Sequence, residues 1–185
     1  MPIDETTALA TLASDAGIEE KARACQQLAI VGSAKSVPAL AALLGDEKLA
    51  AHARSGLEII KDASAGEALG KALDLSGSLL AGVIVSLGVR REAAAVPALF
   101  KLAGSTEPGI RDAAISSLGR IATPEAVENI RSLLTKGRPD HKIPAAHAAL
   151  AAARKLDPAA ASALREFVRA ADVPDHIKKA AGGAS

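Results

Sequence analysis

The stretch SVPALAALLG, residues 36–45, returns almost unchanged as AVPALFKLAG at residues 95–104. Degenerate copies lie between the two and after the second. The shared apolar position recurs in steps of 29, 30 and 31 residues, at Leu40, Leu69, Leu99 and Ile130. A second apolar column keeps the same steps, at Leu28, Leu57, Leu87 and Leu118. Two columns with one spacing indicate an internal repeat of about thirty residues. A looser fifth copy carries Leu150 and Leu164 in these positions.

Each repeat divides into two helices. Small or apolar residues follow i, i+4, i+7 spacing in the first helix, as at Ala24, Leu28 and Val31, which is typical of one buried stripe. A third column lies between the helices and supplies the first residue of the second one: Ser33, Asp62, Glu92, Thr123 and Asp157. Four of these are good N-cap residues, and Glu92 predicts a less regular start. Pro38 and Pro97 fall five residues later, where a proline inside a helix forfeits one backbone bond.

Two segments carry a resemblance to a known family. Residues 110–134, IRDAAISSLGRIATPEAVENIRSLL, resemble a HEAT repeat of the short bacterial variety found in phycobilisome-lyase-type proteins, and residues 25–54 are similar to it. The resemblance covers roughly residues 18–168 and is specific for the fold. It implies an all-α, right-handed α-solenoid of about five hairpins, with the second helices on the concave side.

The predicted organisation is one HEAT-like repeat domain over residues 1–173, followed by a short frayed tail over 174–185. A lone capping helix is expected over residues 4–15. The five repeats are expected over residues 18–45, 46–75, 76–105, 106–136 and 140–170. The insertion KGRPDHK, residues 136–142, is expected to be the longest irregular loop. The poor cap at the C-terminal end also fits a piece of a longer chain.

Composition narrows the classes of partner. The 185 residues carry 22 basic and 21 acidic side chains, and two phenylalanines are the only aromatic residues. A net charge of +1 gives the protein as a whole no electrostatic attraction to nucleic acid. Proteins that bind single-stranded nucleic acid stack its bases on aromatic side chains, and this chain has too few of them. The sequence therefore predicts no nucleic-acid partner. Its longest apolar stretch, residues 79–89, is too short to span a bilayer, so no membrane span is expected.

No residue pattern indicates an enzyme. Cys25 is the only cysteine and excludes an internal disulfide. None of the four histidines is followed by the glutamate found in HEAT-type di-iron enzymes, so we predict no catalytic residue, no metal ligand and no cofactor. The start of the chain lacks the features of a secretory signal, so a cytoplasmic location is the default expectation. A monomer is expected as well. The lyase resemblance leaves an alternative: an accessory protein that assists cofactor attachment, or the interaction arm of a larger enzyme.

The remaining hypothesis is a scaffold or adaptor that binds a protein or peptide on its concave face. In the second helix of each repeat, the positions two residues before and two residues after the repeated leucine are expected to be exposed. These positions are uncharged in the first repeat, and charged side chains appear in the second and third repeats, at Glu67, Lys71 and Lys101. The candidate partner-binding residues are Glu67, Lys71, Lys101, Glu128, Arg131, Ser132 and Arg138. Arg138 belongs to this set because it lies in the expected loop.

Overall fold

The computed structural model describes residues 4–183, which form twelve α-helices and three short 3-10 helices and contain no strand. This confirms the all-α prediction. Contacts divide the chain into two compact units, residues 1–90 and 91–185. The boundary falls inside the third predicted repeat, between its two helices. That all five repeats form a single domain stays a prediction.

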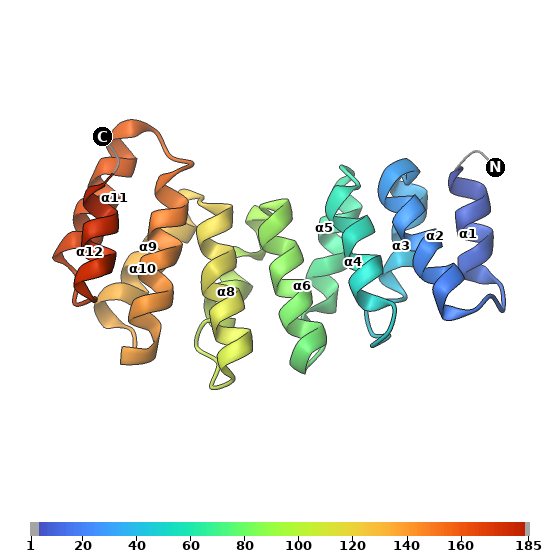
Figure 1. Ribbon diagram of the computed structural model, residues 1–185, viewed down its shortest axis with the longest axis horizontal. Helices are drawn as coiled ribbons and strands as arrows, with labels where there is room; N and C mark the ends of the chain where they lie inside the picture. Colours follow the sequence, from blue (N-terminus) through green and yellow to red (C-terminus); the bar gives the residue numbers. More distant parts are fainter. Residues whose placement is uncertain (1–3, 184–185) are drawn as a thin grey trace. The chain divides into compact units, whose positions relative to one another are not determined.

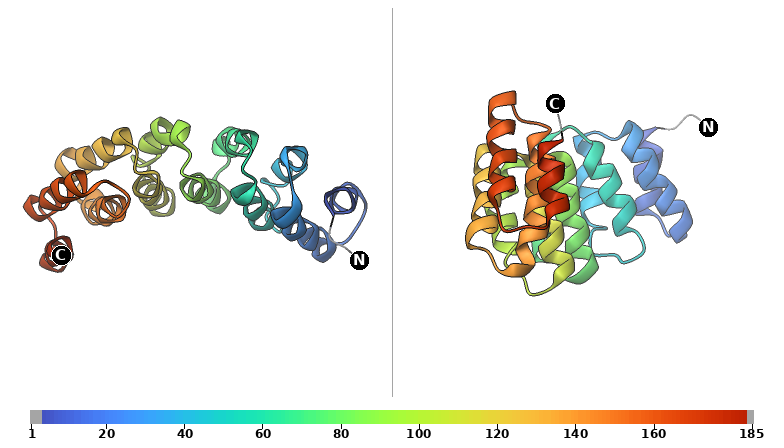
Figure 2. Two further views of the ribbon diagram at one scale, coloured as in Figure 1. Left: turned by 90° about the horizontal axis from the view of Figure 1, so that it is seen from above. Right: turned by 60° about the vertical axis from the view of Figure 1, so that its left-hand side comes forward.

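Unit 1 has two layers of helices (Figures 1 and 2). The first helices of the repeats, α2, α4 and α6, contact one another in turn, and α3 contacts α5 in the second layer. The helix α1 packs on α2 and α3 as the expected cap. The elements are α1 (Glu5–Ala13), α2 (Ile18–Val31), η1 (Ala34–Ser36), α3 (Val37–Ala41), α4 (Ala50–Ile59), α5 (Ala63–Lys71), η2 (Ala72–Asp74) and α6 (Gly77–Arg90).

Unit 2 repeats the arrangement. Its first helices α8 and α10 pack together, α9 and α11 are the second helices of their hairpins, and α7 packs on α8. The elements are η3 (Ala93–Ala95), α7 (Val96–Leu102), α8 (Pro108–Ile121), α9 (Pro124–Lys136), α10 (Pro139–Ala153), α11 (Pro158–Ala170) and α12 (Asp175–Gly182). Each unit is therefore a stack of helical hairpins, the architecture of an α-solenoid.

The predicted apolar columns form the cores of both units. Nine of the leucine and isoleucine positions are fully buried: Leu28, Leu40, Leu57, Leu69, Leu87, Leu99, Leu118, Ile130 and Leu164. Leu150 is half-buried, and the neighbouring Ala149 is fully buried. The fifth repeat therefore presents alanines rather than the expected leucine to the core, because α10 approaches α8 closely.

The predicted N-cap column is confirmed. The side chains of Ser33, Asp62, Thr123 and Asp157 each accept a hydrogen bond from a backbone N–H at the start of the following helix. Glu92 makes no such bond, as its side chain predicted. The repeated prolines behave differently from the expectation. A 3-10 turn precedes α3 and α7, so Pro38 and Pro97 lie in the first turn of a new α-helix and forfeit no intrahelical bond.

Two expectations about irregular segments are wrong. The insertion at residues 136–142 is no long loop, because α9 continues to Lys136 and α10 begins at Pro139. The described part of the C-terminal segment is helical rather than frayed: α12 contacts α11 and α10 and buries Ile177 and Ala181. No helix within residues 4–183 is long and apolar enough to cross a membrane.

Candidate binding groove

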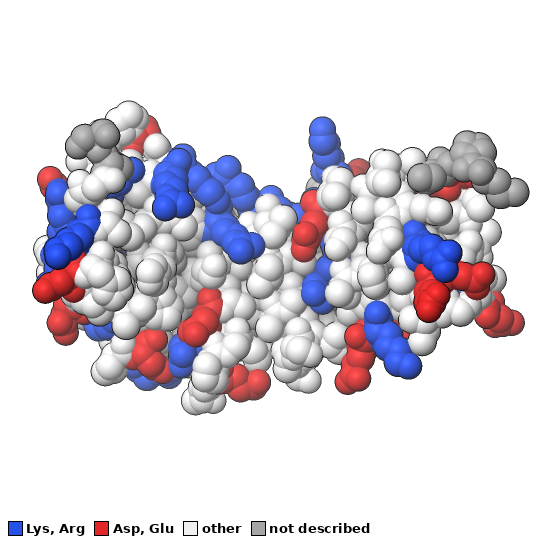
Figure 3. Space-filling model, viewed as in Figure 1, with Lys and Arg blue, Asp and Glu red and all other residues white. Residues whose placement is uncertain are grey.

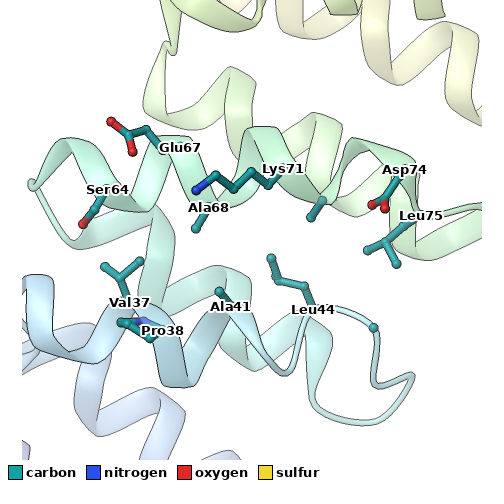
Figure 4. A pocket seen from close by; sticks show the side chains of 12 residues that line it. Val37, Pro38, Ala41, Leu44, Ser64, Glu67, Ala68, Lys71, Asp74 and Leu75 are labelled. Atoms are coloured by element: carbon teal, nitrogen blue, oxygen red, sulfur yellow. The ribbon is translucent and has the colours of Figure 1, made fainter.

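A groove of about 540 Å³ lies between α3 and α5 of unit 1 (Figure 4). Its two walls differ in character. The α3 wall is apolar and consists of Val37, Pro38, Ala41 and Leu44. The opposite wall, from α5 and η2, presents three charged side chains in the order acidic, basic, acidic: Glu67, Lys71 and Asp74.

Hydrogen bonds to the capping helix α1 hold the start of the α3 wall in position. The Glu5 carboxylate accepts hydrogen bonds from the Ser33 backbone N–H at 2.7 Å, from the Ser33 hydroxyl at 2.8 Å and from the Ser36 hydroxyl at 2.6 Å. These bonds, with that from Ser36 the largest, lower the pKa of Glu5. Glu5 was not among the predicted functional residues, yet it attaches α1 to the turn that begins α3.

The charged wall begins at a strong helix cap. Asp62 accepts from the Ser64 hydroxyl at 2.6 Å and from the Ser64 backbone N–H at 3.0 Å, and the hydroxyl bond is the main cause of its lowered pKa. Beyond this cap, Glu67, Lys71 and Asp74 are exposed. Within residues 4–183 their side chains have no ion-pair or hydrogen-bond partner. Their charges are therefore available to a bound molecule.

The seven predicted partner-binding residues do not form one cluster. Glu67 and Lys71 line the groove of unit 1 together. The other five belong to unit 2. Lys101 is exposed on α7, Glu128 is exposed on α9, and Ser132 is half-buried on α9. Arg131 and Arg138 are engaged in contacts within unit 2.

Arg131 packs on an aromatic ring. Its guanidinium carbon lies 5.2 Å from the centre of the Phe167 ring, a cation–π contact that joins α9 to α11. Arg131 and Phe167 are both half-buried. This arrangement makes Arg131 a packing residue between neighbouring second helices.

Arg138 holds a turn in place instead of lying in a free loop. Its two Nη atoms donate to the carbonyl oxygens of Gly104 at 3.2 Å and Ser105 at 3.1 Å, and its Nε donates to Asp140 at 3.1 Å. It thereby ties the turn between α7 and α8 to the start of α10. Arg138 is exposed and lies in the connection between α9 and α10, but this connection is much shorter than the expected loop, because Pro139 begins α10 immediately after it.

A polar cluster at the α8–α10 contact, with Arg111 buried and its two aspartate partners exposed, was not predicted. Arg111 is 9% exposed and donates to Asp112 at 2.8 Å and to Asp140 at 2.7 Å. Hydrogen bonding from Arg138 is the first cause of the lowered pKa of Asp140. His141 lies beside this cluster with 5% of its surface exposed, and burial lowers its pKa. The signal in the sequence was a charge pair spaced by one repeat, at Arg111 and Asp140.

A second cavity of about 800 Å³ lies at the ends of α2 and α4 in unit 1. Ile30 and Ile59 line it and are 75% and 62% exposed. Both lie two residues after the buried leucine of a first helix, so they occupy corresponding positions of consecutive repeats. This cavity lacks the row of unpartnered acidic and basic side chains that distinguishes the groove.

Potentially reactive groups lie apart from the groove. Cys25 is buried on α2, and burial raises the pKa of its thiol to about 11. At such a pKa the thiolate is scarce at neutral pH. In the described part of the chain, no three histidine, cysteine, aspartate or glutamate side chains gather in a way that could hold a metal ion.

Known proteins resemble this chain in fold. The family model described as HEAT repeats matches residues 66–149. The match with a solved engineered protein covers 96% of this chain and 93% of that protein, with 20% identity and a TM-score of 0.53. The complex of CpcE and CpcF of phycocyanin lyase from Nostoc sp. PCC7120 gives 20% identity and a TM-score of 0.52, over 96% of this chain and 72% of that one. No curated protein matches.

A designed armadillo repeat protein completes the comparison, with 18% identity and a TM-score of 0.51 over 95% of this chain and 96% of that one. The hairpin stacks, the family match and these neighbours agree on an α-solenoid of the HEAT or armadillo type. Residues 66–149 match the HEAT-repeat family, and the fold is that of a HEAT-like repeat protein, as residues 110–134 indicated. At identities of 20% or less, the structural neighbours bear on the fold alone.

Proposed function

We propose that the protein is a non-enzymatic interaction scaffold and that the groove between α3 and α5 holds an amphipathic segment of a partner protein. The observation that supports this most is the pairing of an apolar wall with a row of unpartnered charges. HEAT-like solenoids commonly use the surface of their stacked helices for binding. Apolar side chains of the segment would pack on α3, and its charges would face α5.

The charge order of the groove defines the chemistry of the partner. Glu67, Lys71 and Asp74 extend about 10 Å along the wall at helical rise. A segment with basic, acidic and basic side chains in that order complements them, and its aliphatic residue would sit beside Ala41 and Leu44. That Lys101, Glu128 and Ser132 of unit 2 contact a partner stays a prediction. Arg131 and Arg138 already make contacts within unit 2, so we do not propose them as partner-binding residues.

Unit 2 itself suggests how to block the groove. Arg131 follows the repeated apolar residue Ile130 by one position, and Phe167 follows Leu164 by three. The corresponding positions in unit 1 are Ala41 and Ala72, and both line the groove. The double variant Ala41→Arg/Ala72→Phe should therefore fill the groove with a side-chain pair that this fold already uses. Ala42→Arg is the matched control, because Ala42 is exposed next to the groove and does not line it.

The test is selection of peptides from a random display library on the wild-type protein. We expect the selected peptides to carry an aliphatic residue flanked by basic side chains, to lose at least about tenfold in affinity for the filled variant and to bind the Ala42→Arg protein normally. Circular dichroism melting checks that all variants are folded. Equal binding to the wild-type and filled proteins would reject the groove.

A charge exchange tests the orientation. Glu67→Lys/Lys71→Glu preserves net charge while reversing the order of the two groups. Peptides selected on the wild type should bind this variant more weakly, and peptides with the exchanged charges should recover the affinity. Indifference of both peptides to the exchange would contradict the proposed role of Glu67 and Lys71.

The alternative function, assistance in cofactor attachment, rests on the likeness to the CpcE–CpcF complex. That likeness is 20% identical and supports the fold alone, so we do not adopt it. The HEAT fold is generally non-catalytic. The monomeric state, the cytoplasmic location and membership in a larger chain stay predictions.

A further inference from the structure

Unit 2 carries four cations at the ends of its helices. Arg120 lies in the last turn of α8, Arg154 and Lys155 follow the end of α10, and Arg91 precedes η3. We name these four residues the basic patch. All are exposed. In Figure 3 basic side chains gather over the ends of α8 and α10.

Three members of the patch, Arg91, Arg120 and Lys155, lie close enough for their charges to repel one another. The Lys155 ammonium donates a hydrogen bond to the backbone carbonyl of Arg120. Partial loss of solvent around the ammonium is the first cause of the lowered pKa of Lys155, and the charges of Arg91 and Arg120 lower it further. No carboxylate of the described residues counteracts them at Lys155. The folded protein thus holds like charges together without an internal acidic partner at that ammonium.

Stabilisation of helix ends explains only part of this arrangement. Cations at helix C-termini interact favourably with the helix dipole, and Lys155 does cap α8. The arginines with structural roles elsewhere in the chain all have acceptors: Arg90 binds the carbonyl of Leu57, Arg111 binds two aspartates, and Arg138 binds two carbonyls. Within residues 4–183, the guanidinium groups of Arg91, Arg120 and Arg154 have no hydrogen-bond or ion-pair acceptor.

We propose that the basic patch binds an acidic, aspartate- or glutamate-rich segment of a protein partner. Guanidinium groups pair well with carboxylates through two parallel hydrogen bonds. Neighbouring packed helices lie about 10 Å apart, so an extended acidic peptide of about ten residues, up to about 33 Å long, can reach every member of the patch. This surface belongs to unit 2, and the proposal stands independently of the groove in unit 1.

The surroundings favour an acidic protein segment over the two other polyanions. Single-stranded nucleic acid is bound largely by stacking of its bases on aromatic side chains. The only aromatic residues in the chain are Phe100 and Phe167, and Phe167 already packs on Arg131. A membrane surface would draw on exposed apolar side chains next to the cations. The large exposed apolar side chains of the described part of unit 2 are Phe100 and Ile143, on α7 and near the start of α10.

The experiment measures binding of a fluorescent oligoglutamate peptide of about ten residues by anisotropy at several salt concentrations. A single-stranded oligonucleotide of similar length and vesicles containing anionic lipid serve as competing probes. The test variant is Arg120→Gln/Arg154→Gln. The control variant is Lys136→Gln/Lys179→Gln, which removes the same charge from exposed positions elsewhere in unit 2. We expect the test variant to weaken peptide binding at least tenfold and the control to change it less than about twofold.

Arg91→Gly separates binding from folding. Arg91 has a φ of 57°, a conformation that suits glycine, so this variant should melt at a higher temperature and still bind the peptide more weakly. An equal loss in the test and control variants would overturn the proposal, since only net charge would then matter. Tighter binding of the oligonucleotide or the vesicles than of the peptide at the same ionic strength would overturn it as well, as would wild-type protein that fails to bind the peptide at low salt.

Discussion

In unit 1, a groove of about 540 Å³ lies between the neighbouring second helices α3 and α5. In unit 2, Arg131 of α9 lies over the ring of Phe167 of α11, and the cavity beside them is about 320 Å³. Both pairs are second helices of consecutive repeats, but α3 is a short helix of five residues and α9 has thirteen. The pairs also differ at two corresponding side-chain positions, which are Ala41 and Ala72 in unit 1 and Arg131 and Phe167 in unit 2. In a repeat protein, binding space therefore depends on small residues at positions that other repeats fill.

The largest expected effect concerns close helix packing in unit 2. At Gly119 of α8, a Cβ would lie 2.5 Å from the backbone oxygen of Ala148 and 2.7 Å from its Cα. Gly119→Ala should therefore cost about 3 kcal/mol in the free energy of unfolding, because two backbones must separate. Urea denaturation followed by circular dichroism measures it.

The control for this variant is Gly70→Ala in α5 of unit 1, where an added Cβ meets no atom within 4 Å. There the substitution should stabilise the protein by about 0.5–1 kcal/mol through helix propensity. If both substitutions changed stability in the same direction, the close approach of α8 and α10 would not be the cause.

Phe167→Ala converts the filled position of unit 2 into the open form found in unit 1. The ring is half-buried, so we expect a loss of about 2 kcal/mol from reduced burial and the lost contact with Arg131. Arg131→Ala made alone and in combination with Phe167→Ala completes a double-mutant cycle. Additive losses would show that the two side chains do not stabilise each other.

Ala122→Gly addresses the end of α8. Ala122 has a φ of 56°, which a side chain disfavours, but it is 7% exposed and its methyl group is buried. Relief of the left-handed conformation is worth about 1–2 kcal/mol, and loss of the methyl group offsets about 0.8 kcal/mol. Thermal denaturation should show a gain of about 0.5 kcal/mol, and a lower melting temperature would contradict the balance proposed here.

The smallest effect is the pH dependence of the cap on unit 1. The pKa of Glu5 is lowered in the folded protein by its bonds to Ser36 and Ser33. The unfolded chain binds the proton more readily, so the stabilisation is present above the ordinary pKa of 4.5 and is lost as the pH falls through the folded value. Melting temperatures measured from pH 7 to pH 3 should fall less for Glu5→Gln than for the wild type, and identical profiles would exclude Glu5 from the effect.

Local signals predicted much of the fold. The two apolar columns, the N-cap column and the weak cap at Glu92 all follow from short-range spacing and propensity. Two of the expectations that proved wrong depended on tertiary contacts. The segment around Arg138 was expected to loop out, yet its polar groups bind the turn at Gly104. The C-terminal segment was expected to fray, yet Ile177 finds a buried place against neighbouring helices.

The candidate groove was predictable only in part. Glu67 and Lys71 were selected as exposed charges that differ between repeats, and both line it. Asp74 and the apolar wall were missed, because the end of α5 continues into a 3-10 turn that the periodicity did not show. The basic patch was missed because its members come from separate helix ends and mix with acidic residues along the chain.

The sequence by itself determined the repeat, the helix starts, the buried columns and the absence of any enzyme motif, since each depends on the order of residues within one hairpin. The tertiary structure alone decided which charges stay unpartnered and where small side chains leave space. Those properties depend on residues about one repeat apart, and only the packing of one hairpin on the next brings such residues into contact.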